Sequence, residues 1–117
     1  MTGPLAWLLI SALALLAPPT HGPTQWTGRP LAVVASPSQP NAGTRVRVAI
    51  ALLPQGARNV VVAGGGARAR ARPANGNVWV ARLPTGAPGP LEMSVRFTLH
   101  GVRYTAPGGV IFVVPGT

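Results

Sequence analysis

Two segments of the chain carry a large apolar residue at every second position, and a period of two is typical of β-strands that bury one face. The first segment spans 44–53, and its apolar face carries Val46, Val48, Ile50 and Leu52. The second spans 91–99, and its apolar face carries Leu91, Met93, Val95, Phe97 and Leu99. We therefore expect both segments to be strands that line a common core.

Shorter apolar runs predict further strands at 31–36, 59–63, 67–72 and 77–83, and a last strand or strand pair at 102–114 interrupted by Pro107-Gly108-Gly109. The 15 glycines and 14 prolines fall mainly between these runs, where they favour turns. Pro73-Ala74-Asn75-Gly76, for example, is typical of a hairpin turn. No helical period follows residue 20. The pattern predicts a single antiparallel all-β sandwich of about seven strands.

The N-terminal region has a different pattern. Residues 5–17 form an uncharged run rich in leucine and alanine, which Pro18 and Pro19 end. The run is shorter than the roughly 20 residues of a membrane-spanning helix and fits the hydrophobic region of a secretory signal. We predict a signal peptide over 1–22, a linker over 23–29 and the β domain over 30–117. An uncleaved anchor and a buried core helix are the alternatives.

Export places the domain outside the cytoplasm, as an extracellular, cell-surface or periplasmic protein. If the signal is not cleaved, residues 5–17 would tether the domain to a membrane. The chain has no cysteine, so it cannot form a disulfide framework or a thiolate metal site.

The stretch from Val34 to Val48, with its Ser-Pro and Pro-Asn-Ala-Gly turns, resembles the opening of bacterial immunoglobulin-like (fibronectin-type-III-like) domains of exported proteins. Residues 77–84 and 88–95 resemble their second half, where a Trp-containing strand leads through a Pro-Gly corner into a long core strand. The likeness covers about residues 30–115. It implies an immunoglobulin-like β-sandwich, preceded here by the signal or anchor helix, and it implies no particular activity.

The inventory of catalytic residues is small. Glu92 is the only acidic residue, the two histidines are His21 and His100, and lysine and cysteine are absent. Glycosidase chemistry needs two carboxylates, and a zinc site needs three or four ligands. The glycines at 64–66 lack the lysine and the helix of a phosphate-binding loop. We therefore predict no catalytic, cofactor-binding or metal site, no small-molecule substrate and no enzymatic function.

Arginine is the one polar residue type with a pattern, and the net charge of the chain is +9. Arginines at every second position of a strand share one face. If the strand at 67–72 borders the strand at 77–83, and that strand borders 44–53, six arginines would gather on the outer face of one sheet. The predicted anion-binding face comprises Arg45, Arg47, Arg68, Arg70, Arg72 and Arg82.

Two functions remain open from the sequence. The first is an envelope-associated module that binds another protein through its surface. The second is an electrostatic binder of anionic envelope polymers, lipid headgroups or extracellular DNA. A third interpretation gives the arginines no function: they result from the base composition of a GC-rich genome, or even from translation of a non-coding frame. The alternation in 44–53 and 91–99 argues against a non-coding frame.

Overall fold

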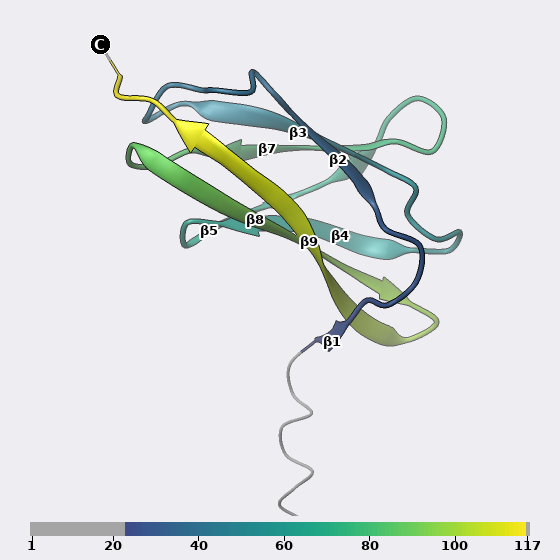
Figure 1. Cartoon of the computed structure of the whole chain (residues 1–117). Helices are drawn as coiled ribbons and strands as arrows, with labels where there is room; N and C mark the ends of the chain where they lie inside the picture. Colours follow the sequence, from purple (N-terminus) through teal and green to yellow (C-terminus); the bar gives the residue numbers. More distant parts are fainter. Residues whose placement is uncertain (1–22, 117) are drawn as a thin grey trace, which may run out of the picture.

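The two alternating segments form β3 (Arg45–Ala51) and β8 (Gly89–Leu99), which are interior strands of two separate sheets (Figure 1). The structure, a computed structural model, describes residues 23–116. The four-stranded sheet has the order β2-β3-β7-β6, with β2 at Ala32–Ser36, β3 at Arg45–Ala51, β7 at Trp79–Pro84 and β6 at Arg72–Pro73. The five-stranded sheet has the order β1-β9-β8-β4-β5, with β1 at Thr24–Gln25, β9 at Val102–Val113, β8 at Gly89–Leu99, β4 at Arg58–Gly64 and β5 at Ala67–Arg70.

The expected all-β class and two-sheet architecture are confirmed. The predicted signal or anchor helix falls outside the described residues. Within residues 23–116 no helix is long and apolar enough to cross a membrane.

The core lies between the sheets and uses the apolar positions that the alternation predicts. Val46, Val48 and Ile50 of β3 face Val95 and Phe97 of β8, and all five side chains are buried. The register continues across the four-stranded sheet, where Val48 lies opposite Ala81 and Val46 opposite Leu83. Because side chains alternate along each strand, the same register turns the charged residues of these strands toward solvent.

The strand predicted at 67–72 is divided between the two sheets. Residues Ala67–Arg70 pair with β4 as β5, whereas Arg72–Pro73 pair with β7 as β6. Ala71 lies at the crossing point, where it is buried and its N–H donates to the carbonyl of Val60 at 2.8 Å. The small side chain of Ala71 lets the chain pass close to the core from one sheet edge to the other.

Residues 23–29 were expected to be a linker, and the structure corrects this. Thr24 and Gln25 pair in parallel with Tyr104 and Thr105 of β9, and the Trp26 N–H donates to the Thr105 carbonyl at 2.8 Å. The Trp26 ring meets Phe97 and Tyr104 at centroid distances of 5.3 and 5.1 Å, both in edge-on geometry. The β domain therefore includes Thr24–Gln25, and the partly buried Trp26 ring packs against its core.

The last strand is continuous through Pro107-Gly108-Gly109. The register of β8 against β9 shifts between Met93 and Ser94, which indicates a β-bulge at this point. A Cβ on Gly108 would lie 3.2 Å from backbone atoms of Met93, so glycine permits the close approach. The bulge absorbs the proline that the sequence pattern treats as a strand break.

One buried polar group joins the start of β3 to the end of β7. Thr85 is 3% exposed and is the only buried polar side chain among residues 23–116. Its Oγ1 accepts the Thr44 N–H at 3.0 Å and lies 2.9 and 3.0 Å from the carbonyl oxygens of Asn41 and Thr44, which can accept its proton. The hydroxyl thus supplies the acceptor for the Thr44 N–H and is itself fully satisfied although it is buried.

Replacing Thr85 by valine keeps the shape of the side chain but leaves the Thr44 N–H without this acceptor. We expect the Thr85→Val variant to lose about 1–3 kcal/mol of unfolding free energy in a urea titration. Thr98→Val is the matched control, because the Thr98 hydroxyl makes none of the side-chain hydrogen bonds found in residues 23–116. Equal losses in the two variants would contradict a structural role for the Thr85 hydroxyl.

The packing of Trp26 gives a second stability prediction. Because its ring contacts Phe97 and Tyr104, Trp26→Ala should lower the unfolding free energy by about 2 kcal/mol or more, and Trp26→Phe by less. Thermal or urea unfolding followed by circular dichroism measures both. A transition midpoint unchanged in Trp26→Ala would mean that residues 23–29 do act as a linker.

Candidate arginine surface

The structure separates the six arginines of the predicted face. Arg45, Arg47, Arg72 and Arg82 lie on the outer side of the four-stranded sheet, and all four are exposed. Arg68 and Arg70 lie on β5, which belongs to the five-stranded sheet. The prediction of a single sheet face with six arginines is therefore wrong. The pairing of β3 with β7 is confirmed, but β5 pairs with β4 instead of β7.

Two arginines of the four-stranded sheet face each other directly. Arg47 of β3 lies opposite Arg82 of β7, and Arg45 lies two residues before Arg47 on the same face, opposite Pro84. Cβ atoms of directly opposed residues are about 5 Å apart, and like charges at such positions destabilise a sheet. The chain has one acidic residue, Glu92, and it lies in the other sheet, so no carboxylate side chain of this sheet separates the two charges.

The crossing from β5 to β6 brings arginines from both sheets to one groove of about 530 Å³. Arg70 comes from β5, Arg72 from β6, Arg82 from β7 and Arg45 from β3. The rest of the lining is apolar and mostly small, and consists of Ala69, Pro73, Ala74, Val80 and Ala81. No acidic and no aromatic residue lines this groove, so its chemistry is that of four guanidinium groups over an apolar floor.

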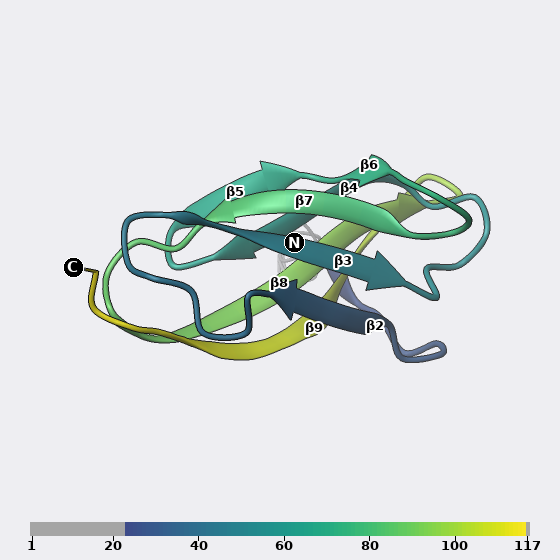
Figure 2. The same cartoon turned by 90° about the horizontal axis from the view of Figure 1, so that it is seen from above.

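The alternation of alanine and arginine in 67–72 produces this arrangement. Ala67, Ala69 and Ala71 turn inward and pack on the core cluster, which leaves the arginines between them on the outside. Figure 2 shows β5 and β6 following each other along one side of the molecule, beside β7. Arg70 and Arg72 therefore stay neighbours although their strands belong to different sheets.

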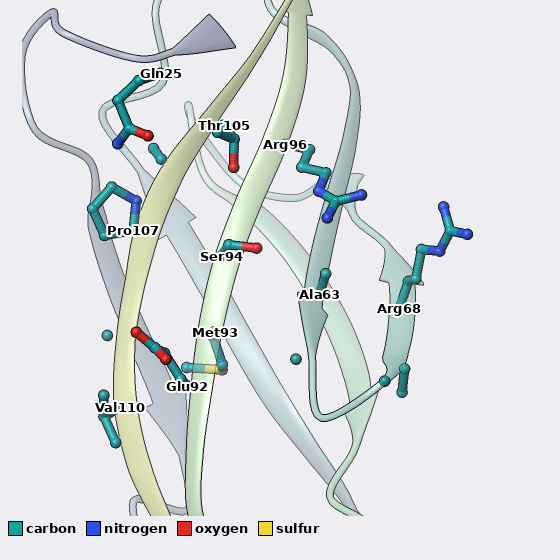
Figure 3. Close-up of a pocket in the computed structure, with 15 residues that line it drawn as sticks. Gln25, Ala63, Arg68, Glu92, Met93, Ser94, Arg96, Thr105, Pro107 and Val110 are labelled. Atoms are coloured by element: carbon teal, nitrogen blue, oxygen red, sulfur yellow. The ribbon is translucent and has the colours of Figure 1, made fainter. Parts of the chain in front are cut away.

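A second hollow of about 720 Å³ lies on the outer face of the five-stranded sheet (Figure 3). Its lining includes Arg68 and Arg96 together with Ala63, Ser94 and Thr105. Figure 3 shows the two arginines on the side of β4 and β5, and Glu92 on the side of β9. The single carboxylate thus lies apart from the arginines of this face.

Arg96 also lies on this outer face, although it is not one of the six arginines of the predicted face. Val61 of β4 has Arg70 as its partner on one side and Arg96 on the other. Neighbouring strands are about 4.8 Å apart, so the Cα atoms of the two arginines are about 10 Å apart. The polar positions of 91–99 already place Arg96 on an outer face, but its proximity to β5 follows only from the strand order β8-β4-β5.

The candidate catalytic groups do not come together. Glu92 lies near the start of β8 and His100 in the turn that follows it, eight positions later in the chain. At about 3.3 Å per residue of strand, this separates the two residues by roughly 26 Å. Residues 23–116 contain no group of three or more His, Cys, Asp or Glu side chains that could hold a metal ion.

No protein-family model, curated protein or solved structure was found to match this chain.

The opposition of Arg47 and Arg82 gives a prediction about stability. Arg82→Thr removes a like charge from directly beside Arg47, so it should raise the unfolding free energy at low salt by about 0.5 kcal/mol. The gain should shrink as salt rises, since added ions screen the repulsion. Arg29→Thr is the control with the same charge change outside both sheets. Identical effects of the two substitutions would argue against specific repulsion between Arg47 and Arg82.

Proposed function

We propose that this chain is an exported, non-enzymatic immunoglobulin-like domain that binds linear anionic polymers through the arginine groove. The strand order supports the immunoglobulin-like assignment. Constant-type immunoglobulin domains place strands A, B, E and D in one sheet and G, F and C in the other, and variable-type domains extend the second sheet with C′ and C″. When β2 to β9 are named A, B, C, C′, D, E, F and G along the chain, the observed sheet β2-β3-β7-β6 is A-B-E-D. The sheet portion β9-β8-β4-β5 is G-F-C-C′.

Two features support a non-enzymatic role outside the cytoplasm. The apolar run at 5–17 has the length and composition of a signal's hydrophobic region. The separation of Glu92 from His100 removes the one acid–base pair that the domain could offer, because proton transfer needs groups within hydrogen-bond reach.

The groove is the observation that carries the proposed ligand. Four arginines from four strands converge there with no carboxylate among the lining residues. Guanidinium groups bind phosphate, sulfate and carboxylate with two parallel hydrogen bonds and lose less hydration than an ammonium group does. A polymer with repeating anionic groups would neutralise several arginines at once, including Arg82 of the groove and Arg47, which lies opposite Arg82 on the neighbouring strand. The anionic groups of the polymer would offset the repulsion between neighbouring arginines by their attraction to each guanidinium group.

The groove lining also limits how such a ligand is recognised. Nucleic-acid binders that stack bases use exposed aromatic rings, and no aromatic residue lines this groove. The contacts available are therefore to the charged backbone of a polymer. Binding of this kind is governed by the release of counterions and weakens steeply as salt rises.

The test compares two triple variants that lose the same net charge. Arg45→Ser/Arg72→Ser/Arg82→Ser removes three of the four arginines that line the groove, whereas Arg29→Ser/Arg58→Ser/Arg103→Ser removes three arginines that do not line it. Binding of each purified protein to heparin and to single-stranded DNA is measured across a salt series. We expect the groove variant to lose about tenfold or more in affinity at low salt and the control variant to lose less, with a shallower salt slope for the groove variant.

Three other results would contradict or change the proposed function. Equal losses in the two variants would show that net charge alone binds the polymer, and the groove would be dismissed. No binding by the wild-type protein at low salt would overturn the function as a whole. Binding to anionic liposomes but to neither polymer would assign the arginines to lipid headgroups instead.

A further inference from the structure

Strand β5 lies between the arginine groove and the hollow of about 720 Å³ on the five-stranded sheet. Ala69 and Arg70 of this strand line the groove. Ala67 and Arg68 line the hollow. Arg68 and Arg70 are two positions apart on one strand, so their Cα atoms are about 7 Å apart. The two depressions therefore meet along β5, with an arginine on each side of their boundary.

The strand register keeps successive arginines close together on this route. Arg82 is directly opposite Arg47, at about 5 Å between Cβ atoms, and diagonal to Arg72, at about 7–8 Å. Arg70 lies two positions before Arg72 in the chain, and Arg96 is about 10 Å from Arg70 across β4. We call the whole series the arginine track. In order along the surface it consists of Arg45, Arg47, Arg82, Arg72, Arg70, Arg68 and Arg96.

The arginine track turns around an edge of the sandwich. Arg82 lies on the outer side of the four-stranded sheet, whereas Arg96 lines the hollow on the outer face of the five-stranded sheet. These two faces point in opposite directions, and packed sheets are about 10 Å apart. Arg70 and Arg72 flank the crossing between the sheets, along the side of the molecule where Figure 2 shows β5 and β6. A ligand that contacts the whole track must bend around this side.

The hollow has room for a polymer beside the last arginines of the track. Ala63 lies between Arg68 of β5 and Ser94 of β8, so small side chains form the floor at this row. Glu92, the one carboxylate side chain of the protein, is four positions from Arg96 on β8, which is about 13 Å. Figure 3 shows Glu92 on the side of β9, away from both arginines. The track therefore ends before it reaches the carboxylate.

We propose that the arginine track binds one flexible single-chain polymer with anionic groups along its backbone. The polymer passes along the groove, bends around β5 and enters the hollow. This inference rests on the proposed function, to which it adds the flexibility of the ligand and the contacts to Arg68 and Arg96. Single-stranded nucleic acid and polyphosphate share the required chemistry, because guanidinium groups bind the phosphates of either with paired hydrogen bonds.

The bend around β5 determines which polymers can fill the track. The track is about 30 Å long from Arg47 to Arg96, and its two ends lie on opposite faces. Duplex DNA has a persistence length of about 50 nm, so it does not turn back within such a distance and contacts one face at a time. A single chain rotates about many backbone bonds and reaches both faces. It therefore gains the contacts to Arg68 and Arg96 that a duplex in the groove does not make.

The first test removes the end of the track in the hollow and leaves the groove intact. Arg68→Ser/Arg96→Ser is compared with Arg29→Ser/Arg103→Ser, which loses the same charge at residues that line neither depression. All four side chains are exposed, so neither variant disturbs the core. The ligand is an oligothymidine of about 16 nucleotides, the upper end of single-strand site sizes.

We expect the hollow variant to bind this oligothymidine about tenfold or more weakly than the wild-type protein at low salt, and the control variant to lose less. The salt slope of the hollow variant should be shallower by about 1.4, because two phosphate contacts are lost. Equal losses in the two variants would overturn the track but leave the groove in place, since its arginines are present in both. A wild-type protein that binds no polymer would overturn the proposed function itself.

Two further ligands test the bend and the source of the polymer. A DNA duplex of the same length should lose no more affinity in the hollow variant than in the control variant, because it contacts one face. A duplex that loses as much as the single strand would show that no bend is needed and would overturn the proposal. Inorganic polyphosphate should depend on Arg68 and Arg96 as oligothymidine does, whereas dependence with oligothymidine alone would identify nucleic acid as the ligand.

A second measurement needs no substitution. Amide chemical shifts in NMR spectra of the wild-type protein report where one equivalent of the oligothymidine lies. We expect shifts both at Val80, which lines the groove, and at Ser94, which lines the hollow. The duplex should shift only one of the two amides. Shifts confined to the groove with the single strand would overturn the track while the proposed function stands.

Discussion

Apolar side chains from β3 and β8 meet between the sheets, and the positions of all other groups depend on this contact. Val46, Val48 and Ile50 are fully buried from one side, and Val95 and Phe97 are buried from the other. Since side chains alternate along a strand, burial of these residues forces Arg47 and Arg96 outward. A slip of one residue would place guanidinium groups in the core at a prohibitive cost in free energy. The core thus determines which faces carry charge.

The outward charges have almost nothing within the protein to neutralise them. With one acidic side chain for ten basic ones, surface ion pairs cannot organise the arginines, so their arrangement follows from strand order alone. That order places Arg47 opposite Arg82 and gathers Arg45, Arg70, Arg72 and Arg82 around one groove. Repulsion within such a cluster is relieved by a bound anion, which links the stability of the sheet to the proposed ligand.

The two long sides of the sandwich differ in how their edge strands are covered. Along one side the chain crosses between sheets at Ala71, and arginines cover the edge that results. Along the other, β1 and residues 40–42 cover the ends of β9 and leave its middle open. Charged edges discourage pairing, whereas an apolar edge permits it.

Alternation and glycine or proline punctuation predict most of the strands, their buried faces and most turns, because these signals act within a few residues; β1 and the division of 67–72 into β5 and β6 are not predicted. Arg45 and Arg47, for example, share an exposed face as a direct consequence of the period of two. Most of the strand neighbours, apart from the predicted pairing of β3 with β7, follow only from the folded domain. The tertiary structure separated Arg68 and Arg70 from Arg72, brought Arg96 near β5, and placed Trp26 against Phe97 and Tyr104. These contacts join residues far apart in the chain, and the free energy that selects them comes from packing two whole sheets together, which no local pattern encodes.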